Sequence, residues 1–235
     1  MHFYQVLLPS SPRIDTSFIL VEDWSMSRAT GIHKRISDAL YQLGPARYYQ
    51  SAYAHIAEAI GLKTGTVLDV GCGPGWLALH VAAGKLEIDA IGIDHSAAMA
   101  TAARRNKGTR LNITIREMDA ADIKFPAETF DVAAAIQSAH HWRDRNAILS
   151  EVHRVLKPGG RFFIYEANKD RNDVPPGWVD RRAGWPPDAV VLAGWRRFGM
   201  NDQEWSDLHG AAEAMSFDTI SLDEHGFYRR MVLTK

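Results

Sequence analysis

The stretch VLDVGCGPG, residues 67–75, places a short apolar run directly before three glycines at alternate positions. The run is typical of a buried strand, and a helix candidate begins immediately after the loop, at Trp76. Glycine is needed where the backbone turns tightly, or where a ligand lies against it with no Cβ in the way. A strand, a glycine loop and a helix in this order predict a ligand-binding turn at the edge of a parallel sheet.

Strand and helix candidates alternate along the chain that follows. The strand candidates are Thr66–Val70, Ile88–Asp94, Leu111–Glu117, Phe130–Ile136 and Arg161–Glu166. The helix candidates between them are Trp76–Ala83, Ala97–Lys107 and Arg143–Leu156. The strands are rich in Val, Ile and Ala without strict alternation, which is typical of parallel strands buried on both faces. The pattern predicts an α/β fold with a doubly wound sheet and right-handed crossovers.

The two flanks of this alternating region differ from it. Helical spacing covers residues 28–43 and continues to Ile60, so we expect an N-terminal arm and helical cap over residues 1–45. Residues 46–235 then form one domain, in which residues 167–200, rich in Pro and Trp, form a loop-rich insertion that resembles a substrate lid. A helix over 202–214 and an antiparallel hairpin of Phe217–Leu222 and Phe227–Leu233 end the chain.

Composition excludes several classes of protein. The 235 residues are 46% hydrophobic and 23% charged, as in ordinary globular proteins. Lys and Arg number 27 against 28 Asp and Glu, so we expect no nucleic-acid partner. Cys72 is the only cysteine, which excludes an internal disulfide and a cysteine-cluster zinc site, and we expect no bound metal. No run of 18 apolar residues and no signal peptide are present, so we expect a cytoplasmic protein without a membrane partner.

The spacing of the glycines discriminates between nucleotide-type ligands. A dinucleotide loop reads G-x-G-x-x-G, and its third glycine, which allows close helix–strand packing, would fall on Trp76. An indole does not fit there, so NAD and FAD are disfavoured. A P-loop needs Gly-Lys-Ser/Thr at its end, and no such triplet follows the loop.

The G-x-G-x-G pattern with Asp69 two residues ahead resembles motif I of the class I S-adenosylmethionine (SAM) dependent methyltransferases. The resemblance extends over about residues 50–166 and 200–235. It includes the strand ending IGIDHS, the segment REMDAADIKFP, the segment FDVAAAIQSAHHW and the turn LKPGG. It implies a Rossmann-like, seven-stranded sheet in the order 3-2-1-4-5-7-6 with an antiparallel last strand. It also implies methyl transfer from SAM, with S-adenosylhomocysteine as product, to an unidentified small-molecule acceptor.

The same resemblance implies a set of cofactor-binding residues. They are Asp69, Gly71, Cys72, Gly73, Gly75, Asp94, His95, Met118, Asp119, Ala120, Ala135 and Gln137. Asp94 would accept both ribose hydroxyls, Asp69 would lie near the methionine ammonium, and Asp119 would accept from the adenine amino group. Ordinary structural roles stay open beside these, such as a tight turn for the glycines and a helix cap or ion pair for Asp69.

His140 is the candidate catalytic residue. It follows the fourth strand, where open α/β sheets bind ligands, and an imidazole suits proton transfer near neutral pH. A packing role for His140 is equally open. Residues 167–200 combine Arg and Lys with Trp178, Trp185 and Trp195, so either they bind an anionic or aromatic acceptor, or they form a charged loop anchored by its tryptophans.

Two alternatives to a methyltransferase remain. A non-catalytic module or partner subunit that binds SAM or S-adenosylhomocysteine would keep the glycine loop, and a tryptophan of the insertion would plug the methyl-facing space. An NAD-dependent oxidoreductase is disfavoured by Trp76. The sequence makes no prediction of oligomeric state.

Overall fold

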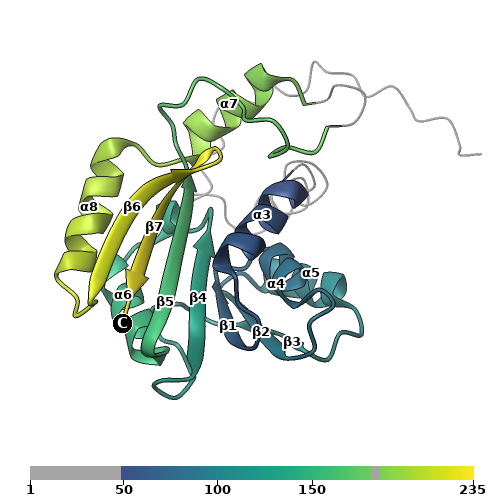
Figure 1. Ribbon diagram of the computed structural model, residues 1–235, viewed down its shortest axis with the longest axis vertical. Coiled ribbons are helices and arrows are strands. Elements are labelled where there is room, and N and C mark those ends of the chain that lie inside the picture. Colours follow the sequence, from purple (N-terminus) through teal and green to yellow (C-terminus); the bar gives the residue numbers. More distant parts are fainter. Residues whose placement is uncertain (1–48, 182–185) are drawn as a thin grey trace, which may run out of the picture. The chain divides into compact units, whose positions relative to one another are not determined.

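The computed structural model describes residues 49–181 and 186–235, which contain a seven-stranded sheet with helices on both faces (Figure 1). The strands are β1 (Gly65–Val70), β2 (Ile88–Asp94), β3 (Ile113–Glu117), β4 (Phe130–Ile136), β5 (Leu156–Ala167), β6 (Thr219–His225) and β7 (Tyr228–Thr234). The helices are α3 (Gln50–Ile60), α4 (Trp76–Ala82), α5 (Ala97–Lys107), α6 (Arg145–Val155), α7 (Asp188–Phe198) and α8 (Asp202–Glu213), with a 3-10 turn η2 (Ala139–His141).

The strand order is β3-β2-β1-β4-β5-β7-β6, as predicted. Strands β1 to β5 pair in parallel, and β7 is antiparallel to both β5 and β6. Asp69 lies opposite Gly92 on one side and Ala134 on the other, and Asp94 lies opposite Glu117. The parallel strands therefore end along one edge of the sheet, where a doubly wound fold binds ligands.

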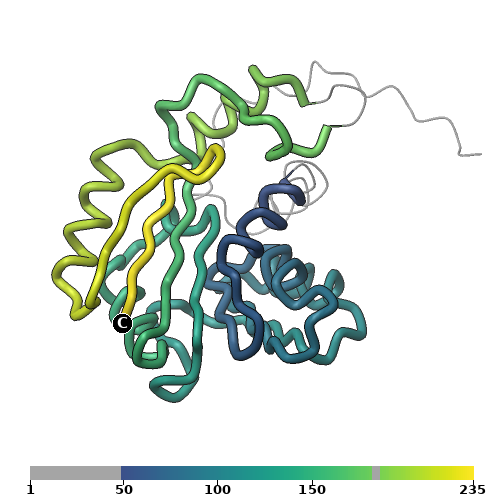
Figure 2. The backbone as a smooth tube through the Cα atoms, in the orientation of Figure 1, coloured from purple at the N-terminus to yellow at the C-terminus, as the bar shows by residue number. Residues whose placement is uncertain are grey.

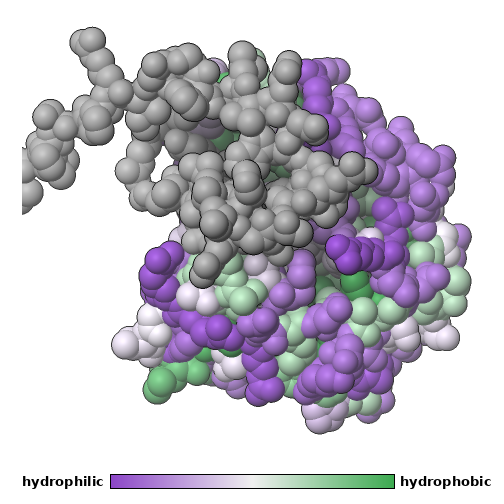
Figure 3. Space-filling model, turned by 180° about the vertical axis from the view of Figure 1, so that it is seen from behind, coloured by the Kyte–Doolittle hydropathy of each residue, from purple (hydrophilic) through white to green (hydrophobic). Residues whose placement is uncertain are grey.

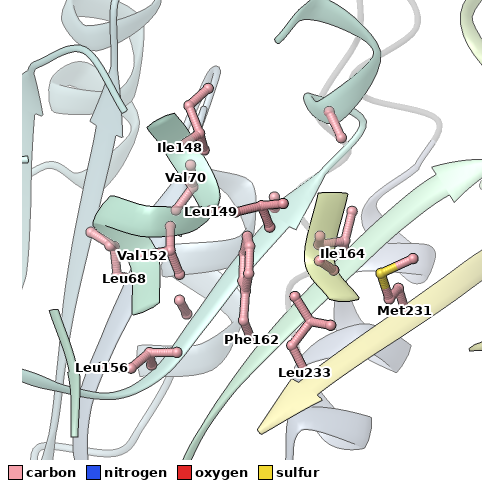
Figure 4. Close-up of a cluster of buried hydrophobic side chains, with 14 of the residues drawn as sticks. Leu68, Val70, Ile148, Leu149, Val152, Leu156, Phe162, Ile164, Met231 and Leu233 are labelled. Atoms are coloured by element: carbon pink, nitrogen blue, oxygen red, sulfur yellow. The ribbon is translucent and has the colours of Figure 1, made fainter. Parts of the chain in front are cut away.

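Helices cover both faces of the sheet with apolar side chains. Helices α6 and α8 cover the face shown in Figure 4, where completely buried side chains interlock, among them Leu68, Leu149, Phe162, Ile164 and Leu233. Helices α3, α4 and α5 cover the other face. Burying one such side chain contributes about 1.5–3 kcal/mol, so the sheet is a rigid support for the loops at its edge.

Helix ends follow local capping chemistry. Ser96 is the N-cap of α5, as predicted, and its hydroxyl accepts a hydrogen bond from the Met99 amide at 3.5 Å. Helix α6 begins at Arg145, two residues later than predicted, because the Asp144 carboxylate caps it by accepting from the Ala147 amide at 2.9 Å. The capping side chain of Asp144 therefore determines where α6 begins, and the spacing of apolar residues alone does not.

Other predicted boundaries also need correction. Strand β5 begins at Leu156 rather than Arg161, because Leu156 still pairs with Phe130 ahead of an irregularity in the register. Strand β3 begins two residues later than predicted, beyond the 97% exposed Leu111. The helix over 28–43, and the arm over 1–45, lie outside the described residues.

The insertion contains a helix that the sequence analysis did not predict. Helix α7 follows Pro187, whereas the dense Pro and Trp content nearby predicts a loop. Figure 2 shows the chain leaving β5, passing through this segment and continuing into α8. Trp178 and Trp195 fix it to the tip of the β6–β7 hairpin, since Trp195 stacks on Phe227 at 4.3 Å between ring centroids and Trp178 meets the same ring at 5.7 Å. Trp178 and Trp195 therefore act as the anchoring tryptophans of the second interpretation given above for residues 167–200. Trp185 lies outside the described residues.

Replacing Gly226 is expected to detach this anchor. Gly226 has φ +65°, and a Cβ there would overlap the indole of Trp178. We expect Gly226→Ala to displace Trp178, to expose the segment from Asn168 to Arg181 to limited proteolysis, and to lower the free energy of unfolding by about 2–4 kcal/mol. The control is Gly177→Ala, because Gly177 also has positive φ (+81°) but has open space around it. Equal protease resistance in both variants would contradict this anchor.

The described surface is largely hydrophilic. Its exposed large hydrophobic side chains are Leu86, Leu111, Val190, Phe198 and Leu222. On the face seen in Figure 3, hydrophobic areas are interrupted by hydrophilic ones. Within residues 49–181 and 186–235, no helix combines the length and apolar character needed to cross a bilayer.

Candidate functional site

The glycine loop joins β1 to α4 through three residues with positive φ. Gly71, Gly73 and Gly75 have φ of +68°, +50° and +80°, which side chains rarely adopt. A Cβ on Gly71 would lie 2.7 Å from the Cβ of Ser138, so that glycine allows two loops to touch. A Cβ on Gly73 would meet nothing within 4 Å. Gly73 therefore borders open space, and its φ, not packing, is what requires glycine there.

Asp94 ends β2 and is tied to this loop. Its Oδ2 accepts from the Gly73 amide at 2.9 Å and its Oδ1 accepts from the Ser96 amide at 2.8 Å. The residue is 8% exposed. Each carboxylate oxygen can accept two hydrogen bonds, so the two backbone bonds orient the group and leave one acceptor position per oxygen for a ligand. Two adjacent hydroxyls are a matching pair of donors.

Asp69 is a buried carboxylate near the end of β1. The residue is 3% exposed, and its Oδ2 has no hydrogen-bond partner among the described residues. Burial, and to a smaller extent the charge of Asp94, raises the pKa of Asp69 to about 7, against a partly opposing backbone hydrogen bond from Ala78. An unpartnered buried carboxylate is costly unless a cation or donor reaches it. Asp69 therefore fits a ligand ammonium.

Cys72 packs rather than reacts. The thiol is buried against Gly92, where a Cβ would lie 2.9 Å from Cys72 Sγ. Burial, together with the charges of Asp69 and Asp94, raises the pKa of Cys72 well above its ordinary value. Because the thiolate is the nucleophilic form, this cysteine is a packing residue of the loop.

The segment after β3 lies beside the end of β2. The Met118 amide donates to the Asp94 carbonyl at 2.9 Å, and the half-buried Met118 and Ala120 pack on the core. Asp119 is exposed, and its Oδ1 accepts from the Ala121 amide at 2.9 Å. The His95 side chain is exposed, with Nδ1 3.9 Å from Asp94 Oδ1. The segment predicted to bind adenine, residues 118–120, therefore begins at the backbone contact with Asp94, the residue predicted to bind the ribose.

The two remaining residues predicted to bind the cofactor, Ala135 and Gln137, lie on either side of the end of β4. Ala135 is completely buried inside the strand, among core side chains. Gln137 follows the strand with φ +53°, an uncommon conformation for a side-chain-bearing residue, and its amide donates to the Tyr165 carbonyl at 2.8 Å. Next to it, the Ser138 hydroxyl donates to the Val70 carbonyl at 3.0 Å. This bond holds the end of β4 against the glycine loop.

His140 lies in η2 and is paired with Glu166, the penultimate residue of β5. Its Nδ1 is 2.8 Å from Glu166 Oε2, and Glu166 Oε1 accepts from the Ala139 amide at 2.5 Å. Glu166 is completely buried, and the His140 side chain is 12% exposed. Burial disfavours the imidazolium, but the charge and hydrogen bond of Glu166 outweigh it and raise the pKa of His140.

Glu166 and Ser138 also belong to this site, although neither is among the residues predicted from the sequence. A signal for Glu166 was available, since an acidic residue ends the apolar run FFIYEA at the same sheet edge as His140. Ser138 left no comparable signal, because its role depends on close approach to Val70, 68 residues earlier in the chain.

The residues at this edge fit SAM. An unpartnered buried carboxylate at Asp69 suits its ammonium, open space at Gly73 suits close approach, and oriented acceptors at Asp94 suit the ribose hydroxyls. Within the described residues, the ring contacts of Trp178 and Trp195 are with α3 and the β6–β7 hairpin, and none is with a residue of the glycine loop. These two tryptophans therefore give no support to the plugged, non-catalytic alternative.

Comparison with known proteins agrees with this geometry. Residues 68–164 match the family described as "Methyltransferase domain". A sterol 24-C-methyltransferase of Aspergillus fumigatus is 33% identical over 126 residues, which cover 51% of this chain and 33% of that protein. An erythromycin 3''-O-methyltransferase of Saccharopolyspora erythraea is 32% identical over 151 residues, which cover 60% of this chain and 49% of that protein. The chain thus spans a third to a half of the length of these relatives.

The fold has solved counterparts. A crystal structure from Methanococcus maripaludis, assigned to the SAM-dependent methyltransferases, has a TM-score of 0.68 at 18% identity and covers 86% of this chain and 92% of that one. The sheet order is that of the class I, Rossmann-like methyltransferase fold, as predicted. Residues 68–164 of this chain are thus similar to the methyltransferase-domain family. SAM is the methyl donor of this family and S-adenosylhomocysteine its product, as predicted.

Proposed function

We propose that this chain transfers the methyl group of SAM to a small-molecule acceptor bound at the carboxyl edge of β4 and β5. The observation that carries the proposal is the link between Asp94 and Gly73, which presents oriented acceptors beside open backbone. Both relatives are methyltransferases of small molecules, one acting on carbon and one on oxygen.

Alignment is the main contribution of the chain's residues in this proposal. When bound, SAM supplies an activated methyl group on a sulfonium. Asp94 holds the ribose, Asp69 the ammonium, and Asp119 with Met118 and Ala120 the adenine. Holding an acceptor in line with the methyl carbon can supply about 7–11 kcal/mol of the barrier reduction in favourable cases. Rigid supports at β1, β2 and β4 suit that task.

The acceptor side is the less specified half of the site. We propose a small, anionic or aromatic acceptor, because residues 167–181 and 186–200, which follow the carboxyl end of β5 in the chain, combine several arginines with Trp178 and Trp195. This segment would act as a cover that Trp178 and Trp195 keep anchored to the hairpin. The single cysteine and balanced charge support a cytoplasmic protein that binds no nucleic acid.

The pKa of Asp69 predicts a pH-dependent affinity for S-adenosylhomocysteine. Below pH 7 the buried carboxyl is protonated, and binding the ligand ammonium must release that proton. We expect the affinity to fall about tenfold for each pH unit below 7 and to level off above it. Calorimetry in buffers of different ionisation enthalpy measures the released proton.

Asp69→Asn is the companion variant. Its affinity should be weaker at pH 8 and lose this pH dependence. Since the pKa of Asp69 is raised on folding, the ligand-free protein loses stability as the pH rises from about 4 to about 7, and Asp69→Asn should be the more stable protein at pH 8. A wild-type affinity that is flat between pH 5.5 and 8 would contradict the role of Asp69.

A methyl-transfer assay tests the proposed function. SAM labelled on its methyl group is incubated with the protein and with separate pools of phenols, carboxylic acids, amines and sterols. Transfer of label to one pool, lost in Asp94→Ala, is the expected result. Tight binding of S-adenosylhomocysteine without transfer to any pool would favour the non-catalytic module.

A further inference from the structure

A buried carboxylate holds one nitrogen of His140 and leaves the other nitrogen available. Glu166 Oε1 accepts from the Ala139 amide at 2.5 Å and from the His140 amide at 3.3 Å, while Oε2 is 2.8 Å from His140 Nδ1. With two backbone amides bound, Glu166 is held as an acceptor, so the proton of this contact belongs on His140 Nδ1. Nε2 of His140 has no hydrogen-bond partner in the part of the chain that the structure describes, and the side chain keeps 12% of its surface exposed.

The pair lies at the proposed methyl-transfer edge. Ser138, two residues before His140, donates to the Val70 carbonyl at 3.0 Å and lies against Gly71. Glu166 is the penultimate residue of β5, next to β4 in the sheet. The glycine loop, the turn that bears His140 and the end of β5 are therefore joined by direct contacts.

We propose that Glu166 is a positioning residue that keeps His140 in its Nδ1–H tautomer, so that His140 Nε2 is the general base for an acceptor with a phenolic or enolic hydroxyl. The inference rests on the proposed function. As the acceptor oxygen bonds to the methyl carbon of SAM and the carbon–sulfur bond breaks, the hydroxyl proton moves to Nε2. The products are the methyl ether, S-adenosylhomocysteine and an imidazolium, which then loses its proton to water.

The chemistry of the pair selects this class of acceptor. Carboxylates are already ionised at neutral pH, and aromatic amines are unprotonated with a free lone pair, so neither needs a base for attack. A phenol, with a pKa of about 10, is mostly protonated at neutral pH and gains from one. Besides Glu166, the charged groups that act on His140 are Lys169, which follows β5, and Glu204 of α8; they act in opposite directions and bond to each other at 3.1 Å.

Glu166→Gln tests the pair by reversing its polarity. The glutamine carbonyl can still accept from the backbone amides, while its NH2 group donates to His140 Nδ1 and forces the proton onto Nε2. The matched control is Glu213→Gln, which removes the carboxylate of the exposed His209–Glu213 pair, 3.6 Å apart on α8. His140→Asn removes the base itself and serves as the second variant if Glu166→Gln does not fold.

The probes are phenol and 4-nitrophenol, which is about half ionised near pH 7 and largely ionised at about pH 8. We expect Glu166→Gln and His140→Asn to lower kcat for phenol at least 100-fold and kcat for 4-nitrophenol less than tenfold, with unchanged affinity for S-adenosylhomocysteine. Wild-type kcat for phenol should rise with pH through an apparent pKa above 6.5. Glu213→Gln should match the wild type throughout.

A second readout does not depend on turnover. NMR of 15N-labelled imidazoles in the complex with S-adenosylhomocysteine, recorded at a pH above the pKa of His140, should show His140 as Nδ1–H in the wild type and as Nε2–H in Glu166→Gln. An Nε2–H wild type, equal loss for both probes, or methylation of amines or carboxylates but of neither phenol would overturn the proposal. Failure to bind S-adenosylhomocysteine would instead overturn the proposed function on which it rests.

Discussion

Replacing Asp94 by alanine is expected to abolish measurable binding of S-adenosylhomocysteine while the protein stays folded. In the proposed complex its carboxylate accepts two ribose hydroxyls, and hydrogen bonds to a charged group contribute about 1.5–3 kcal/mol each. Losing both corresponds to at least a 100-fold loss of affinity. The same carboxylate orients Gly73 and Ser96, so the loop would also lose its fixed position. Calorimetric titration measures the affinity, and circular dichroism measures the fold.

Two further variants make this result specific. Asp94→Asn keeps the shape and one oxygen, and we expect it to bind with an affinity between the wild type and Asp94→Ala. Asp89→Ala removes an exposed carboxylate from the same strand, near its opposite end, and should bind as the wild type does. Undiminished affinity in Asp94→Ala would show that the cofactor site lies elsewhere.

Two alanine substitutions in the glycine loop should differ in their effects on the free energy of unfolding and on the affinity for S-adenosylhomocysteine. Gly71→Ala places a Cβ 2.7 Å from Ser138 at φ +68°, and we expect it to lower the free energy of unfolding by about 2–4 kcal/mol. Gly73→Ala meets no neighbour, so it should cost only about 1 kcal/mol for its positive φ. Because its new methyl group enters the space proposed for the cofactor, affinity for S-adenosylhomocysteine should fall at least tenfold.

Gly84→Ala is the control for Gly73→Ala. Gly84 also has a positive φ, +67°, and a Cβ there would meet nothing within 4 Å, but it lies after α4, outside the loop. Denaturant unfolding should give the two variants similar stabilities, and titration should give Gly84→Ala the wild-type affinity. Equal affinities in both variants would remove Gly73 from the cofactor site.

The order of the sheet was predictable from local signals. Apolar runs at 88–94 and 130–136 matched β2 and β4 residue for residue, because each is bounded by polar or turn residues. The glycine loop and Asp94 were predictable for a similar reason, since both lie at the ends of buried strands. Helix α7 was not, because its Trp195 stacks on Phe227, which lies in the distant β6–β7 turn, and because proline and tryptophan obscure the helical spacing.

The pair of His140 and Glu166 likewise could be predicted only in part from the sequence. His140 was identifiable as a polar residue after a strand, whereas the role of Glu166 depends on the contact between the end of β5 and the turn η2, which bears His140. The two residues are 26 positions apart in the chain, and a complete helix, α6, lies between them. No local pattern in the sequence specifies which carboxylate would meet which imidazole, so the contact itself had to come from the structure.

The central claim is that the glycine loop binds SAM, and calorimetric titration of the purified protein with S-adenosylhomocysteine, with NAD as control, tests it most directly. We predict binding at micromolar concentration or tighter, which corresponds to about −8 kcal/mol or better, and no binding of NAD. A folded protein that binds NAD tightly and does not bind S-adenosylhomocysteine would contradict the account.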